Sequence, residues 1–286
     1  MEKVLWKSQQ PFPDNFVPAD FLSLLKKNPN FRPYTYSSLV LLSTPITQHL
    51  ASIFIFLSVF VHLKEQSLDP RTLIWLSVAC FILGYLLWSF LNQTHDTPHA
   101  AINDYLKAFK SSILIFLALM SLSPVLRTLT ASTSSDTIWA LAAILFILNA
   151  ILADYSAPSE KELSHGRLIP VLSMNAAVSA SVVLASRLAT DIAVFGLMLF
   201  SIQSFALFPL LRHRLQTSPV AVQASLTACL VMSATWLTLT LSQRLAYMYA
   251  LVFTSVTFCA PGLLIWAQKY KNELRGPWDV AVPRVN

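Results

Sequence analysis

Charged residues are scarce in this chain, and their scarcity excludes an ordinary soluble domain. Only 12% of the 286 residues are charged and 55% are hydrophobic, whereas roughly a quarter of the residues in soluble domains are charged. The 20 Lys and Arg outnumber the 14 Asp and Glu. In so apolar a chain this excess is expected to set membrane topology and to meet anionic lipid headgroups, not nucleic acid.

Glycine and cysteine are also few. Their small number and their positions exclude several kinds of catalytic site. The five glycines form neither a phosphate-binding loop nor a nucleophile elbow, and no His-Glu-x-x-His zinc motif occurs. The three cysteines fall inside apolar stretches, where they are expected to be small buried hydrophobic residues and not a disulfide framework. We therefore predict no catalytic residues, no metal site and no cofactor in this chain.

One pair of histidines has a spacing that could bind a metal ion. His95 and His99 are four residues apart with Asp96 between them, which would place both imidazoles on one face of a helix. Pro98 interrupts this stretch and favours a solvated loop instead.

Eight long apolar stretches with almost no charge fill most of the chain. A bilayer core of about 30 Å needs roughly 20 apolar residues of helix, and backbone groups in lipid must bond within their own segment. The sequence therefore predicts an all-α, polytopic helical membrane bundle over residues 43–267, with tails at 1–42 and 268–286. The spans are expected at about 43–62, 71–91, 108–126, 137–153, 168–186, 191–211, 220–240 and 246–267.

The distribution of Lys and Arg predicts that both tails lie in the cytoplasm. With eight spans, one side of the membrane holds 15 of these residues and the other side holds five. Positive residues gather on the cytoplasmic side of membrane proteins. In the N-terminal tail, Phe21, Leu24 and Leu25 follow helical spacing ahead of Lys26 and Lys27. They predict a short helix that lies on the membrane surface, or that docks on a partner or on the bundle itself.

Small residues recur every four positions along the fifth stretch, in a pattern typical of close helix packing in lipid. A groove for substrate or lipid is the alternative interpretation of the same stripe. Side-chain amides within membrane spans usually form hydrogen bonds between helices, although they also occur at functional sites. The candidates for packing or for a lipid groove are Ser173, Asn175, Ala177, Ser181, Ala185, Asn149 and Gln203.

Five further residues are candidates for the membrane interface. They lie at the ends of expected spans, where a charged or phenolic side chain reaches water at little cost. They are Arg127, Asp136, Asp154, Tyr155 and Arg187.

Seven short strings, taken in order and with their spacing, resemble the PIG-C family, a membrane subunit of the phosphatidylinositol N-acetylglucosaminyltransferase complex. The resemblance extends over nearly the whole chain. The strings are Gln10–Asn15, Ser123–Thr130, Ser135–Ile138, Asp154–Tyr155, Leu184–Leu188, Phe205–Pro209 and Gly276–Asp279.

The resemblance implies a non-catalytic subunit in the membrane of the endoplasmic reticulum. The family's complex transfers GlcNAc from UDP-GlcNAc to phosphatidylinositol, the first step of GPI-anchor synthesis. Its glycosyltransferase fold lies in a separate subunit, PIG-A, and PIG-H, PIG-P, PIG-Q and PIG-Y are further partners. The expected role is a scaffold, with or without a groove that positions phosphatidylinositol. A lipid scramblase or small-solute transporter is the alternative, although it would predict inverted repeats with broken helices.

The two tails carry the candidates for partner binding. Phe12, Asp14 and Asn15 lie among prolines that fix the backbone, and Trp278 and Asp279 follow Gly276 and Pro277. Rigid aromatic and carboxylate groups of this kind often anchor protein interfaces. Alternatively, Trp278 belongs to the aromatic belt at the membrane surface.

Overall fold

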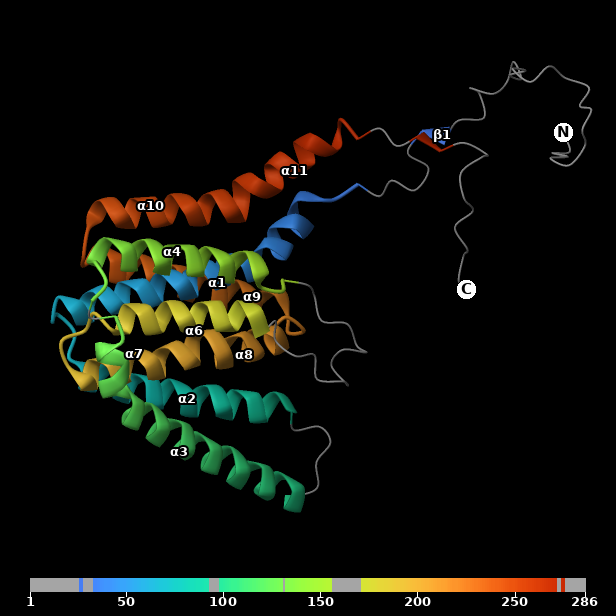
Figure 1. Ribbon diagram of the computed structural model, residues 1–286. Coiled ribbons are helices and arrows are strands. Elements are labelled where there is room, and N and C mark those ends of the chain that lie inside the picture. The colour runs from blue at the N-terminus through green and yellow to red at the C-terminus, as the bar shows by residue number, and fades with distance from the viewer. Residues whose placement is uncertain are drawn as a thin grey trace, which may run out of the picture.

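The protein is a bundle of long helices that run back and forth along one axis (Figure 1). The computed structural model describes residues 26–27, 33–92, 98–130, 132–155, 171–271 and 274–275, and all structural statements refer to these. The first four helices are α1 (Tyr36–Lys64), α2 (Pro70–Asn92), α3 (Pro98–Thr128) and α4 (Ser135–Leu152). They are followed by α6 (Val171–Ala185), α7 (Asp191–Ile202), α8 (Phe208–Leu215), α9 (Val220–Leu239), α10 (Gln243–Thr254) and α11 (Ala260–Gln268).

Two of the long helical runs contain a turn of π-helix. The segment η1 (Gln203–Leu207) joins α7 to α8, and η2 (Ser255–Cys259) joins α10 to α11. Each is followed by a proline in the first turn of the next helix, Pro209 or Pro261. Proline donates no backbone hydrogen bond, and the wider π turn fits a site where the regular pattern must break.

Seven helical runs within the described residues are long and apolar enough to cross a membrane. The predicted class, an all-α membrane bundle, is therefore confirmed. The helix α6 has 15 residues and falls below that length, and residues 156–170 before it lie outside the described part. The count of eight spans stays a prediction.

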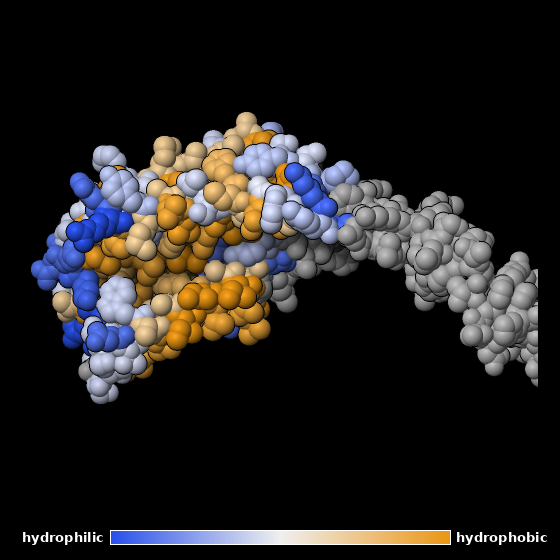
Figure 2. All heavy atoms as spheres, turned by 90° about the horizontal axis from the view of Figure 1, so that it is seen from above, coloured by the Kyte–Doolittle hydropathy of each residue, from blue (hydrophilic) through white to orange (hydrophobic). Residues whose placement is uncertain are grey.

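The core lies around α1, which is flanked by α4, α7 and α9. Phe56 of α1 is fully buried, and its ring centroid lies 5.7 Å from that of Phe146 on α4 and 5.2 Å from that of Phe205 on η1. Aromatic side chains from three helical segments, α1, α4 and η1, thus pack together at one level along the bundle axis. Outward-facing positions are also apolar, as Trp75 (74% exposed) and Leu251 (68% exposed) illustrate. Figure 2 shows hydrophobic side chains along the middle of the bundle and hydrophilic ones at its left end and again toward its right end.

Both tails leave the same end of the bundle (Figure 1). The backbone amide of Tyr34 donates to Oε1 of Gln268 over 3.1 Å, which links the start of α1 to the end of α11. Beyond them, β1 (Lys26–Lys27) pairs antiparallel with β2 (Leu274–Arg275). This contact fits an even number of membrane crossings between the two tails.

Two helices begin earlier than the spans that were predicted within them, and the boundaries of the spans themselves stay predictions. The helix α1 begins at Tyr36, ahead of the predicted span start near residue 43, and α3 begins at Pro98, ahead of the predicted start near residue 108. His99 is therefore helical and does not lie in a loop, whereas His95 is outside the described residues. The predicted helix around Phe21, Leu24 and Leu25 also falls on residues that the structure does not describe.

Candidate functional site

A network of buried polar side chains joins α1, α4 and α6 near the end of the bundle that carries the tails. The amide of Asn149 on α4 donates from Nδ2 to both the carbonyl and Oγ of Ser173 on α6, each over 2.9 Å. Ser173 Oγ donates in turn to the Asn149 carbonyl over 2.8 Å. Oδ1 of Asn149 lies 2.8 Å from Nε2 of His49 on α1. Asn149 and Ser173, both proposed from the sequence, thus contact each other. Asn149 also contacts His49, which was not proposed.

Arg212 of α8 lies next to this network and is only 5% exposed. Its Nη1 donates to the carbonyl of Pro45 on α1 over 3.2 Å, while its Nε has no hydrogen-bond partner. Among the described residues no carboxylate forms an ion pair with it. Arg212 interacts electrostatically with His49 and Tyr155, so a buried positive charge is held here mainly by neutral groups.

Tyr155 lies just beyond the end of α4 and closes the network on that side. Its hydroxyl donates to the carbonyl of Ala150 over 2.7 Å, and its ring lies edge-on to the imidazole of His49 at 5.8 Å between centroids. Burial raises the pKa of the Tyr155 phenol above its ordinary value, and the positive charge of Arg212 opposes this rise. The phenol therefore stays neutral and acts as a hydrogen-bond donor.

We expect that replacing Arg212 by Met leaves the protein at least as stable as the wild type. The substitution keeps most of the volume and loses one hydrogen bond from a charged donor, worth about 1.5–3 kcal/mol. It also removes the desolvation cost of a buried charge, which is on the order of several kcal/mol. Thermal unfolding of the detergent-purified protein would measure this. Arg212→Ala, which leaves a cavity, should unfold at a lower temperature, and equal loss in both variants would show that the charge itself stabilises the fold.

The small-residue stripe of α6 is buried against two neighbouring helices. Ala177, Ser181 and Ala185 have no exposed surface, and Ser173 is 4% exposed. Ser173 contacts α4 through Asn149, whereas Ser181 accepts a hydrogen bond of 2.7 Å from Ser201 on α7. The structure thus places this stripe in helix contacts. Asn175 lies outside the stripe and is exposed.

Gln203 lies instead at an apolar groove on the surface of the bundle. The groove has a volume of about 310 Å³ and runs between α2 and the η1–α8 segment. Of the candidates for packing or for a lipid groove, it is Gln203 that lines this space. The other lining residues are Cys80, Phe81, Gly84, Tyr85, Trp88, Leu207, Phe208, Leu210 and Leu211.

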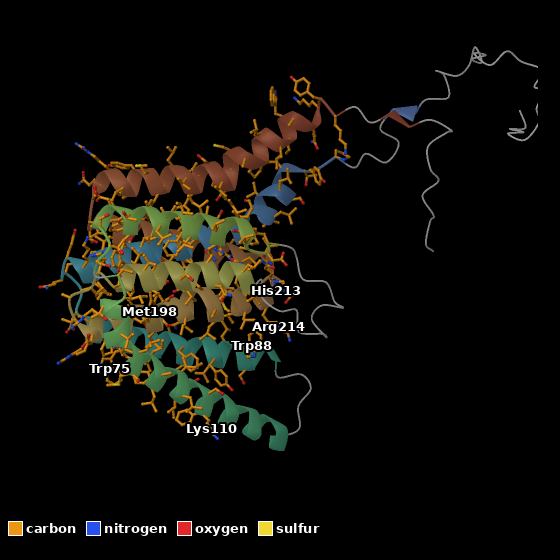
Figure 3. All side chains as sticks on the ribbon, in the orientation of Figure 1. Trp75, Trp88, Lys110, Met198, His213 and Arg214 are labelled. Carbon is orange, nitrogen blue, oxygen red and sulfur yellow. The ribbon has the colours of Figure 1, made fainter. Side chains whose placement is uncertain are left out.

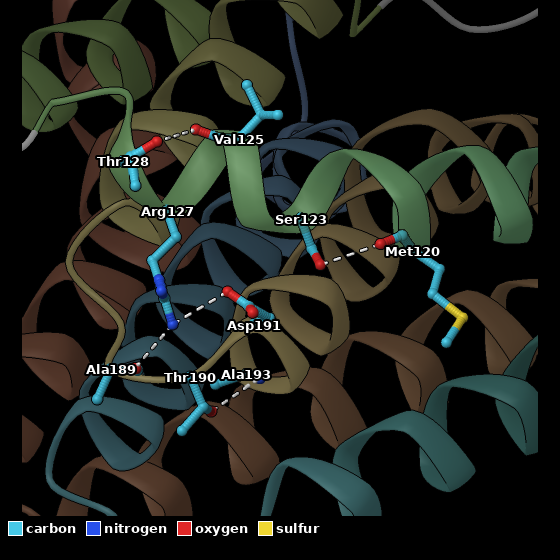
Figure 4. Close-up of polar contacts among 9 residues, drawn as sticks. All are labelled: Met120, Ser123, Val125, Arg127, Thr128, Ala189, Thr190, Asp191 and Ala193. Carbon is cyan, nitrogen blue, oxygen red and sulfur yellow. Dashed lines mark hydrogen bonds and ion pairs between the residues drawn. The ribbon is translucent and has the colours of Figure 1, made fainter.

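Three of the five interface candidates lie at the end of the bundle opposite the tails. They are Arg127, Arg187 and Asp136. Arg127 at the end of α3 lies 3.1 Å from Asp191 at the start of α7, and both are about 40% exposed (Figure 4). An exposed pair of this kind contributes about 1 kcal/mol or less. Arg187 donates to the carbonyls of Thr130 and Thr133 and so joins the loop after α6 to the loop after α3.

Asp136 and Asp154 lie at the two ends of α4. Asp136 lies in the first turn, just after Ser134, whose hydroxyl accepts from the Thr137 backbone amide. A carboxylate at this position suits the positive end of the helix dipole. Asp154 follows the last turn of α4 beside Tyr155. The partner-binding candidates Phe12, Asp14, Asn15, Trp278 and Asp279 all lie outside the described residues.

The whole sequence matches a known protein family. The family model described as "GPI2: Phosphatidylinositol N-acetylglucosaminyltransferase" matches residues 1–279. The chain belongs to the GPI2 family. The family that was inferred from its short strings is thereby confirmed.

Curated relatives of the GPI2 family agree over nearly the full length. The chain is 38% identical over 285 residues to the phosphatidylinositol N-acetylglucosaminyltransferase GPI2 subunit of Schizosaccharomyces pombe, covering 99% of this chain and 87% of the relative. It is 33% identical over 280 residues to a subunit of the same enzyme from Homo sapiens, covering 98% and 92%. No solved structure matches the chain.

Sequence reasoning missed His49 and Arg212, although a signal for both was present. Ionisable residues inside apolar spans are rare and mark functional or structural polar sites. His49 lies within the first predicted span. Arg212 was assigned to a loop because the sixth span was ended at residue 211, whereas α8 continues to Leu215.

Proposed function

We propose that this chain is a non-catalytic membrane subunit of the complex that transfers GlcNAc from UDP-GlcNAc to phosphatidylinositol. This reaction is the first step of GPI-anchor synthesis. The observation that carries the proposal is the family match over residues 1–279, with relatives named as subunits of that enzyme. We further propose that the protein lies in the endoplasmic reticulum membrane with both tails in the cytoplasm.

A transferase of this kind faces a geometric problem that a membrane bundle can solve. Its donor is soluble, whereas its acceptor is a lipid whose headgroup lies at the membrane surface. Holding two reactants in a productive arrangement can lower a barrier by about 7–11 kcal/mol in the best cases. The bundle would hold the catalytic subunit at the correct depth and orient it toward the lipid. Its rigid packing around Phe56 and its buried polar network suit a scaffold.

The proposed partners are the catalytic subunit PIG-A and the subunits PIG-H, PIG-P, PIG-Q and PIG-Y. We propose that the catalytic subunit docks on the two tails through Phe12, Asp14, Asn15, Trp278 and Asp279. The pairing of β1 with β2 supports this, because it brings the two tails into one region beyond the same end of the bundle. A single partner could then contact both.

The expected result for Phe12→Ala or Trp278→Ala is weaker assembly of the complex with normal insertion of this chain. Loss of an aromatic anchor at an interface typically costs about 2 kcal/mol or more. Co-purification of the catalytic subunit with the tagged chain from membranes would measure the loss. Gln9→Ala, in the same tail, provides the control. Unchanged assembly after deletion of residues 1–15 and 276–286 together would place the contacts within the membrane.

A further inference from the structure

A glycine, Gly84, forms part of the wall of the groove between α2 and the η1–α8 segment. A Cβ built on Gly84 would meet only Cδ2 of Leu211, at 3.9 Å, which is an ordinary contact. The volume of about 310 Å³ lies at the lower end of the range for ligand pockets, roughly 300–1,000 Å³. Leu83 beside the groove is 66% exposed and Leu210 in its wall is 40% exposed. The groove therefore opens onto the surface that faces lipid, and its apolar walls suit a hydrocarbon chain.

A cationic side chain, Arg214, lies beside one end of the groove. Trp88 lines it, and the guanidinium carbon of Arg214 lies 6.0 Å from the centroid of the Trp88 ring. Figure 3 shows Trp88, His213 and Arg214 together at the end of the bundle from which the tails leave. Tryptophan prefers the headgroup level of a bilayer, and arginine binds phosphate through its planar fork of donors. Apolar walls and a cationic end together complement a lipid with a charged headgroup.

We propose that this groove binds an anionic phospholipid, with one acyl chain along the wall that contains Gly84 and Leu211 and with the phosphate against Arg214. The inference rests on the proposed function in one respect, because that function makes phosphatidylinositol the lipid to be held. A lipid bound here lies with its headgroup at the level of the tails. The groove would thus present the acceptor beside the surface proposed for the catalytic subunit.

Lipid retention by the purified full-length chain tests the site. The protein is equilibrated in bilayer nanodiscs of phosphatidylcholine doped with phosphatidylinositol or with phosphatidylserine, and bound lipids are identified by native mass spectrometry. We expect both anionic lipids to be retained over phosphatidylcholine. Gly84→Leu fills the groove and should abolish retention, whereas Gly262→Leu should not, since no atom lies within 4 Å of a Cβ built there.

The variant Arg214→Gln tests the contribution of the positive charge separately from that of the apolar groove. This variant should still retain lipid but lose its preference for anionic headgroups by roughly tenfold, as expected for the loss of one charge-assisted hydrogen bond. Arg214→Lys should keep part of the preference. An unchanged preference in Arg214→Gln, or unchanged retention in Gly84→Leu, would overturn the proposal.

Thiol reactivity gives a second measurement that needs no substitution. All three cysteines are exposed, but Cys80 lines the groove whereas Cys229 and Cys259 lie outside its lining. Adding phosphatidylinositol should slow the modification of Cys80 by a membrane-permeant maleimide several-fold and leave the other two thiols unchanged. Equal rates at Cys80 with and without the lipid would exclude occupancy of the groove. Because no transferase is present in either assay, a negative result would leave membership in the complex untouched.

Discussion

Ala177→Leu is expected to lower the yield of stably folded protein more than any other single substitution considered. Ala177 has no exposed surface and lies on α6 one turn after Ser173, which is bonded to α4. A leucine there must separate the helices or adopt a strained conformation, at a cost of about 1–3 kcal/mol and occasionally more. Close backbone approach is also the main source of helix association in lipid. The yield of monodisperse protein after detergent extraction would measure the effect.

Ala143→Leu is the matched control for this substitution. Ala143 lies on α4 but on its exposed side, so the same side chain should enter lipid without strain. A normal yield for both variants would show that the α6 stripe tolerates bulk and is not a tight packing face.

Asn149→Ala is expected to have the second largest effect, because one amide joins three helices. The substitution removes its bonds to His49 and Ser173 and leaves both partners buried. Hydrogen bonds between helices in membranes average about 0.6 kcal/mol and reach about 1.7 kcal/mol. Two such links therefore predict a loss of roughly 1–3 kcal/mol, which thermal unfolding in detergent would detect.

Asn175→Ala provides the comparison, since Asn175 lies on the neighbouring helix α6 but is exposed. It should change the unfolding temperature little. An equal effect of the two substitutions would mean that the buried network contributes nothing particular to stability.

The helices themselves were predictable, because membrane spans are encoded locally. A run of about 20 apolar residues has few alternatives in a bilayer. The stripe of Ser173, Ala177, Ser181 and Ala185 was also visible, since its four-residue period places these side chains on one helix face. Boundaries were less predictable. Pro98 was taken as a break, yet proline fits the first turn of a helix, where its missing N–H would be unpaired anyway.

The contacts between helices could not be derived in the same way. Asn149 was proposed to form a hydrogen bond between helices, but its partner His49 is 100 residues away in the chain. No periodicity links the two. The groove around Gly84 likewise depends on how α2 lies against the η1–α8 segment, which no single stretch encodes. Arg212 was overlooked because the sixth span was ended at residue 211, where the apolar run stops, whereas α8 continues to Leu215.

We expect GlcNAc transfer to require this chain, and we expect the chain alone not to catalyse the reaction. Transfer from UDP-GlcNAc to phosphatidylinositol can be measured in three preparations: membranes that lack only this chain, the same membranes after it is re-expressed, and the purified chain alone. We predict activity in the second preparation only. Unchanged transfer in membranes that lack the chain, or transfer by the purified chain alone, would contradict the proposed role.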